Sequence, residues 1–280
     1  MVGCGARASA LRGELGAALL DANSLFTAGQ LRQALELYTS AALAAADMGD
    51  PSLAPAVRAA AQDALEQVEP KDAPEDTAAV LAAVWAGKRE EAEPPPSAAA
   101  AAVAAAHLGA VASALAGCLA VALAGVDARR LAGCCLVRLQ EPTKAKAQLA
   151  RALVTLDQAA RDAEDLQRLL GAASSNAASH SALAAGVDGA GRLRGWVEQV
   201  ESKRGEVLSA LAAEQLGRAG ARDARGAEVT LRRALNHAIK SGDLRCEASV
   251  RSNLAAALLQ MSQVDHGGGD HGHGAAAAAA

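Results

Sequence analysis

Apolar and small residues recur at helical spacing along most of this chain. Three segments place a small, a large and a small residue at positions i, i+4 and i+7, which lie along one stripe of a helix. A second helix can approach the small residues closely, while the large residue fills the space between the backbones. The stripes are Ala34-Tyr38-Ala41, Ala145-Leu149-Ala152 and Ala227-Leu231-Ala234. This pattern predicts antiparallel helical hairpins that pack through these faces.

Each stripe follows a segment that favours a turn. Gly29 precedes the first stripe, Pro142 and Thr143 precede the second, and Asp223 precedes the third. We expect Pro142 to stop one helix and Thr143 to cap the next, and we expect Asp223 to cap the helix of the third stripe. All three segments therefore predict a helix, a tight turn and a second helix.

The same periodicity predicts helices over most of the remaining chain. We expect helices over residues 9–28, 31–47, 55–68, 80–85, 127–139, 144–170 and 192–218, and a last hairpin over 226–262. Asp127 is expected to cap the helix over 127–139. A loop is expected over 171–191, because Ser, Gly and Asn are concentrated there.

Breaks in the periodicity divide the chain into four parts. Residues 1–70 are expected to form a helical hairpin with a third helix, and residues 71–97 a short helix and a Pro-rich linker. A second helical array is expected over 98–264, and a disordered tail rich in His, Gly and Ala over 265–280.

Residues 97–126 carry no formal charge, and their length is sufficient to cross a bilayer. Leu108, Val111, Leu115 and Leu119 nevertheless fall on one stripe, as in the buried helix of a soluble array. We therefore expect a buried helix here and no membrane partner. A membrane-anchored helical protein that uses residues 98–126 is the alternative.

Composition strengthens the prediction of an all-α fold. Alanine, the best helix former, accounts for about a quarter of the 280 residues, and only Phe26, Tyr38, Trp85 and Trp196 are aromatic. The net charge is −4, from 27 basic and 31 acidic residues that are mixed along the chain. Without a basic block or stacking aromatics, a dedicated nucleic-acid surface is not expected.

The five cysteines are odd in number and form no CxxC pair, and the adjacent Cys134 and Cys135 point to different sides of a helix. We expect reduced thiols that pack as small apolar side chains in a cytoplasmic protein. The first thirteen residues contain Arg7 and Arg12 but no acid. A short organelle-targeting segment is therefore the alternative for the location.

No catalytic pattern is present in the sequence. The chain lacks a GxxxxGK[ST] phosphate loop, a GxSxG nucleophile elbow and an HExxH metal motif. His180 lies between two serines, and adjacent residues cannot form a Ser–His catalytic pair. The histidines of the tail, His266, His271 and His273, have no rigid frame to hold a metal ion. We therefore predict a protein that is not an enzyme, with no cofactor and no metal.

The segment over residues 127–157 resembles a tetratricopeptide repeat. Gly133 lies where that family keeps a small residue for helix contact, and Ala145, Leu149 and Ala152 match the marks of the second helix. Residues 17–46 look like another copy. Residues 227–261 are similar to a second helix followed by the first helix of the next repeat, where Asn253, Leu254 and Ala255 fit an Asn-Leu-small pattern.

The resemblance implies an α-solenoid of stacked hairpins, interrupted by the Pro-rich linker, whose groove holds a peptide or helix of another protein. Its first-helix faces make Arg129, Arg138, Arg251 and Asn253 the expected partner-binding residues. The bulky aromatic that the family carries early in each first helix is missing. Residues 22–69 are also similar to a microtubule-interacting and trafficking domain, a three-helix bundle, which makes a trafficking adaptor the alternative.

Overall fold

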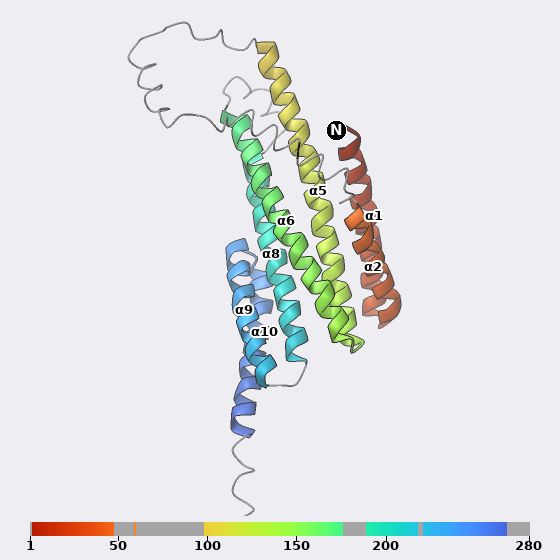
Figure 1. Ribbon diagram of the computed structural model, residues 1–280, viewed down its shortest axis with the longest axis vertical. Coiled ribbons are helices and arrows are strands. Elements are labelled where there is room, and N and C mark those ends of the chain that lie inside the picture. The colour runs from red at the N-terminus through yellow and green to blue at the C-terminus, as the bar shows by residue number, and fades with distance from the viewer. Residues whose placement is uncertain (1, 48–58, 60–97, 176–188, 218–220, 268–280) are drawn as a thin grey trace, which may run out of the picture.

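The computed structural model describes residues 2–47, 59, 98–175, 189–217 and 221–267. Over these residues the chain forms seven helices and no strand, so the all-α prediction is confirmed. Figure 1 shows the helices lying side by side in an elongated array. The helices are α1 (Val2–Thr27), α2 (Leu31–Asp47), α5 (Ala98–Arg138), α6 (Pro142–Ser175), α8 (Gly189–Leu216), α9 (Ala221–Ser241) and α10 (Leu244–Gly267).

Tight turns reverse the chain after α1, α5 and α9. Gly29, Gln140 and Gly242, which follow α1, α5 and α9, adopt left-handed backbone angles with φ of 78°, 62° and 69°. Beyond Gly29, the N–H of Gln30 donates to the carbonyl of Leu25 at 2.9 Å, and the equivalent bond after Gln140 measures 2.8 Å. These bonds satisfy carbonyls that the helix end leaves free, and they bring the next helix back antiparallel.

Two predicted caps around α5 and α6 are wrong. α5 runs from Ala98 to Arg138 without a break, so Asp127 lies inside a helix and does not begin one. No proline interrupts this stretch, and alanine favours the helical state on both sides of Asp127. α6 begins at Pro142 itself, because the first helical position needs no N–H donor, and Thr143 is therefore not its cap.

Other helix boundaries also differ from the sequence prediction. α9 begins at Ala221, so Asp223 lies in the first turn, where a carboxylate favours the helix dipole, and is not the cap. Residues 171–175 continue α6 and residues 189–191 begin α8, which shortens the predicted loop. Residues 265–267 belong to α10 instead of the tail.

Several predictions lie outside the described residues. They are the helices over 55–68 and 80–85, the Pro-rich linker before residue 98, most of the loop over 171–191, His180 and the tail beyond residue 267. The third helix of the alternative three-helix bundle lies outside the described part as well.

The helices pack in a regular order. Each packs against the helix that follows it among the described elements, and α1, α5, α8 and α10 also contact one another in succession. We call these four helices the first-helix row, and α2, α6 and α9 the second helices. Across the described part of the chain, α2 and α6 both pack on α5 but share no extensive contact with each other.

The three predicted stripes lie in the core. Each of their nine side chains is at most 4% exposed. Gly133 is also buried, and a Cβ atom there would lie only 3.0 Å from Cγ and Cδ2 of Leu149 in α6. Leu254 is half-buried, whereas Ala255 is exposed and faces away from the neighbouring helices.

The apolar stretch of α5 is an interior helix of the array. By length and composition alone, its residues 111–138 could cross a membrane. In its most apolar window, however, 61% of the residues are buried against the rest of the chain. Leu119 and Val126 are fully buried in a cluster with Leu149 and Leu156 of α6.

Asp243 caps the amino end of α10. Its Oδ1 accepts hydrogen bonds from the backbone N–H groups of Arg245 and Cys246, both at 3.0 Å. Its Oδ2 accepts a hydrogen bond from the Ser202 hydroxyl of α8 at 2.7 Å. The bond from Ser202, followed by the bond from the Cys246 N–H, holds the pKa of Asp243 below its usual value. The ionised cap therefore fixes α10 to α8.

Replacing Asp243 by alanine should lower the free energy of unfolding at pH 7 by about 1 kcal/mol. The pKa of Asp243 is lower in the folded chain than in the unfolded chain, so its ionised carboxylate stabilises the fold above about pH 4. This stabilisation is lost as the pH falls through the pKa of the folded state. Urea unfolding should therefore show a smaller difference in the free energy of unfolding between wild type and Asp243→Ala at pH 3 than at pH 7. Asp243→Asn, which keeps an acceptor without a charge, is the control, and a gap of equal size at both pH values would contradict the assignment.

Candidate partner-binding surface

Four charged side chains join α5 to α8 within the first-helix row. Arg130 Nε lies 3.1 Å from Glu206 Oε2, and Lys203 Nζ lies 2.9 Å from Asp127 Oδ1. Within α8, Lys203 Nζ also approaches Glu206 Oε2 at 3.5 Å. All four side chains are about one-quarter exposed, so each is shielded from water on one side and open on the other. We call this group the charged quartet.

The start of α10 lies beside the charged quartet. Burial, with a smaller contribution from the negative charges of Glu206 and Asp243, raises the pKa of the Cys246 thiol to about 11. Lys203 and Arg130 oppose that rise. The Cys246 thiol also donates to the Ser202 carbonyl at 3.7 Å. The charges that join α5 to α8 therefore lie near the start of α10, where the buried Cys246 is held as the neutral thiol.

Other polar contacts fix α8 in place. Arg204 Nη2 donates to Asp157 Oδ1 of α6 at 2.6 Å. His237 Nδ1 of α9 lies 2.7 Å from Glu201 Oε2, and both side chains are 19% exposed. His237 is thus an interface residue between α8 and α9. Because α8 is held from both sides, the charged quartet is presented on a rigid support.

The two expected binding residues of α5 lie on different faces. Arg129 is half-buried against α6, and its Nη1 donates to Gln148 Oε1 at 3.3 Å. Arg138 is exposed in the last turn, with its guanidinium 4.9 Å from the centre of the Phe26 ring of α1. Nine residues separate the two, which corresponds to opposite sides of an α-helix. The structure therefore does not bring them together on one surface.

The two expected binding residues of α10 also diverge. Arg251 is exposed and pairs with Glu247 one turn earlier, with Arg251 Nη2 2.5 Å from Glu247 Oε1. Asn253 is half-buried, and its Nδ2 donates to the Ser209 hydroxyl of α8 at 2.9 Å. Arg251 is thus available to a partner, whereas Asn253 already uses its amide to join two helices of the chain.

The charged quartet was missed from the sequence. Asp127 with Arg130 and Lys203 with Glu206 are each an i, i+3 pair of opposite charge, which is a common feature of exposed helices. Their meeting across α5 and α8 depends on how two distant helices dock. The i, i+3 spacing was the available signal, and it did not distinguish this surface from other charged helix faces.

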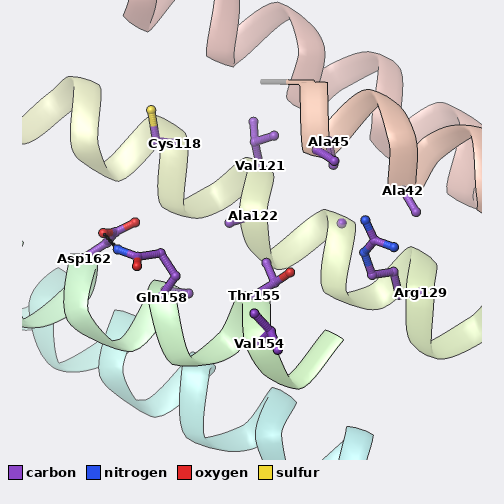
Figure 2. A pocket seen from close by; sticks show the side chains of 13 residues that line it. Ala42, Ala45, Cys118, Val121, Ala122, Arg129, Val154, Thr155, Gln158 and Asp162 are labelled. Carbon is purple, nitrogen blue, oxygen red and sulfur yellow. Dashed lines mark hydrogen bonds between the residues drawn. The ribbon is translucent and has the colours of Figure 1, made fainter. Parts of the chain in front are cut away.

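A pocket of about 290 Å³ lies between α2, α5 and α6. Figure 2 shows Ala42 and Ala45 of α2 on one side and Thr155 and Gln158 of α6 on the other, with α5 between them. At one end lies Arg129, and at the other lies Asp162, which is only 2% exposed. We call this cavity the α2–α5–α6 pocket.

Nothing in the described residues points to metal or redox chemistry. Cys118, Cys134, Cys135 and Cys246 are thiols without a disulfide. Over the same part of the chain, no group of three or more His, Cys, Asp or Glu side chains could hold a metal ion.

The comparisons with known proteins provide no relative from which a function could be transferred. No protein-family model, curated protein or solved structure matches the chain. Its function must therefore be inferred from the packing of the helices, the exposed charges and the pocket.

Proposed function

We propose that this protein is a non-enzymatic interaction scaffold that holds a peptide or helix of another protein. Its helical hairpins would stack as a tetratricopeptide-like α-solenoid, and the partner would lie along the first-helix row. The same proposal places the protein in the cytoplasm, in keeping with cysteines that form no disulfide among the described residues. It includes no nucleic-acid, membrane or cofactor partner.

One observation carries the proposal: first helices contact first helices from one hairpin to the next. The contacts run from α1 to α5, from α5 to α8 and from α8 to α10, whereas α2 and α6 share no extensive contact within the described residues. Helical repeats stacked in this order generate an extended surface lined by one helix of each repeat. Such surfaces characteristically serve to bind another chain.

The side chains along this row suit a polar peptide. Arg138 and Arg251 are exposed, and the charged quartet in the same row presents two positive and two negative groups. Mixed charges of this kind select a partner by complementarity more than they raise its affinity. A partner peptide with acidic residues facing the two exposed arginines is the simplest match.

An array of immobilised overlapping peptides from the source organism tests this proposal. The full chain should bind a defined set of peptides, and Arg138→Glu or Arg251→Glu should weaken a subset of them about tenfold. Arg168→Glu, at an arginine of α6 outside the first-helix row, is the matched control. A chain that remains helical by circular dichroism but binds no peptide, or binds the same peptides after both substitutions, would refute the proposal.

A further inference from the structure

We propose that the α2–α5–α6 pocket binds a small organic carboxylate, whose charged head pairs with Arg129 and Arg151 and whose short apolar body fills the cavity. This inference goes beyond the proposed scaffold function, because it assigns a low-molecular-weight ligand to the chain. The site is separate from the charged quartet, since Arg129 contacts α6 while Arg130 contacts α8.

Arg129 is a half-buried cation without an acidic partner among the described residues. Its guanidinium donates to the side-chain oxygen of Gln148 at 3.3 Å, and that amide is neutral. Two acidic residues of the same helices, Asp127 of α5 and Asp157 of α6, pair with basic side chains of α8 instead. A half-buried positive charge is costly until an anion pairs with it, so Arg129 favours an anionic ligand in the pocket.

A second arginine adds to the positive charge at this end of the pocket. Burial, followed by the positive charge of the exposed Arg151 of α6, lowers the pKa of Arg129. Neither cause is opposed by a carboxylate of the described part of the chain. Two guanidinium groups whose charges act on each other favour an oxyanion that accepts charge-assisted hydrogen bonds from both.

The rest of the cavity suits an apolar body. Its floor on α5 includes Val121, Ala122 and Gly125, and its walls include alanines of α2 and Val154 of α6. The Val154 side chain is 70% exposed, so a ligand body in the cavity removes apolar surface from water. The volume of about 290 Å³ is close to the lower end of the range for small-molecule sites, which favours a small ligand.

The opposite end of the pocket orients the ligand. Asp162 lines that end, is 2% exposed and accepts a hydrogen bond from Gln158 Nε2 at 2.8 Å, drawn as a dashed line in Figure 2. A carboxylate head is therefore disfavoured there and lies at Arg129. The lining along α5 extends from Cys118 to Arg129, about 16 Å of helix, so the apolar body must be shorter than this.

Isothermal titration of the full chain with three probes tests the inference. Sodium octanoate carries the head and an apolar body, sodium acetate carries the head alone, and octylammonium chloride carries the body with the opposite charge. Octanoate should bind to a single site per chain, at least about tenfold more tightly than acetate or octylammonium.

Four variants locate the site. Arg129→Gln keeps a hydrogen-bonding side chain but removes the charge, so it should lower the affinity for octanoate at least about tenfold, and Arg151→Gln, at an exposed side chain, by about threefold. Ala122→Leu fills the floor of the cavity without changing the charge and should lower the affinity about tenfold. Arg232→Gln, at a 64% exposed arginine of α9 outside the pocket lining, should leave it unchanged. Circular dichroism verifies that each variant keeps its helical content.

Several results would overturn the inference. Octanoate that fails to bind, binds no more tightly than acetate or octylammonium, or binds equally well to Arg129→Gln would do so. If octanoate does not bind while Arg129→Gln removes peptides from the peptide array or abolishes a dimer in sedimentation, the anion belongs to a partner protein or a second copy and the small-ligand assignment is wrong. If octanoate binds as expected but the array does not respond to Arg138→Glu or Arg251→Glu, the pocket assignment stands and the scaffold function fails.

Discussion

Replacing Tyr38 by alanine should lower the free energy of unfolding by about 4 kcal/mol. Tyr38 is fully buried in a cluster with Ala22, Ala132 and Cys135, which joins α1, α2 and α5. Burial is the main reason why the pKa of Tyr38 is raised to about 12. Because Ala22 and Ala132 are small, they cannot extend into the space that the ring leaves. Urea unfolding followed by circular dichroism measures the loss.

Tyr38→Phe separates the ring from its hydroxyl. The hydroxyl donates to Asn23 Oδ1 at 2.7 Å, and Asn23 is exposed, so water can replace this bond. The phenylalanine variant should therefore lose about 1 kcal/mol or less. If Tyr38→Ala were no more destabilising than Tyr38→Phe, the ring would not be the central core residue of the first hairpin.

Replacing Gly125 by valine should lower the free energy of unfolding by about 3 kcal/mol. α2 and α5 approach so closely at this point that a Cβ atom on Gly125 would lie 2.7 Å from the Cβ of Ala45. Both atoms are Cβ atoms attached directly to a helix backbone, so neither can yield without shifting a helix. Chemical unfolding of the full chain measures the effect.

Two further variants test the cause of this effect. Gly16 is also a helical glycine, but nothing lies within 4 Å of its missing Cβ, so Gly16→Val should change stability by only a few tenths of a kcal/mol. Adding Ala45→Gly to Gly125→Val removes the opposing methyl group and should restore most of the loss. No recovery in the double variant would show that the close approach of α2 and α5 is not the reason.

Helical periodicity predicted the local structure of this chain well. The helix over residues 31–47 and the burial of stripes such as Ala34-Tyr38-Ala41 follow from spacing alone, because each stripe must face another helix. Helix ends were less predictable. Asp127 and Asp223 have good capping propensity, but the favourable helical context around each of them outweighs it.

The functional surfaces could be predicted only in part. Arg129 and Arg138 were expected to share one face, yet their separation in a single continuous helix places them on opposite sides of it. The charged quartet and the α2–α5–α6 pocket combine residues from helices that are far apart in the sequence. Such combinations depend on which helices pack together. An amphipathic pattern predicts which face of a helix is buried, but it does not predict which helix packs against that face.

Affinity purification of the tagged full chain from its own cells, followed by mass spectrometry, tests the central claim most directly. Arg251→Glu is the comparison variant, because Arg251 is exposed and its replacement leaves the core intact. The account predicts a reproducible set of partner proteins that the wild-type chain retains and that the variant loses in part. A folded wild-type chain that retains no protein above background, or a partner set unchanged in the variant, would contradict it.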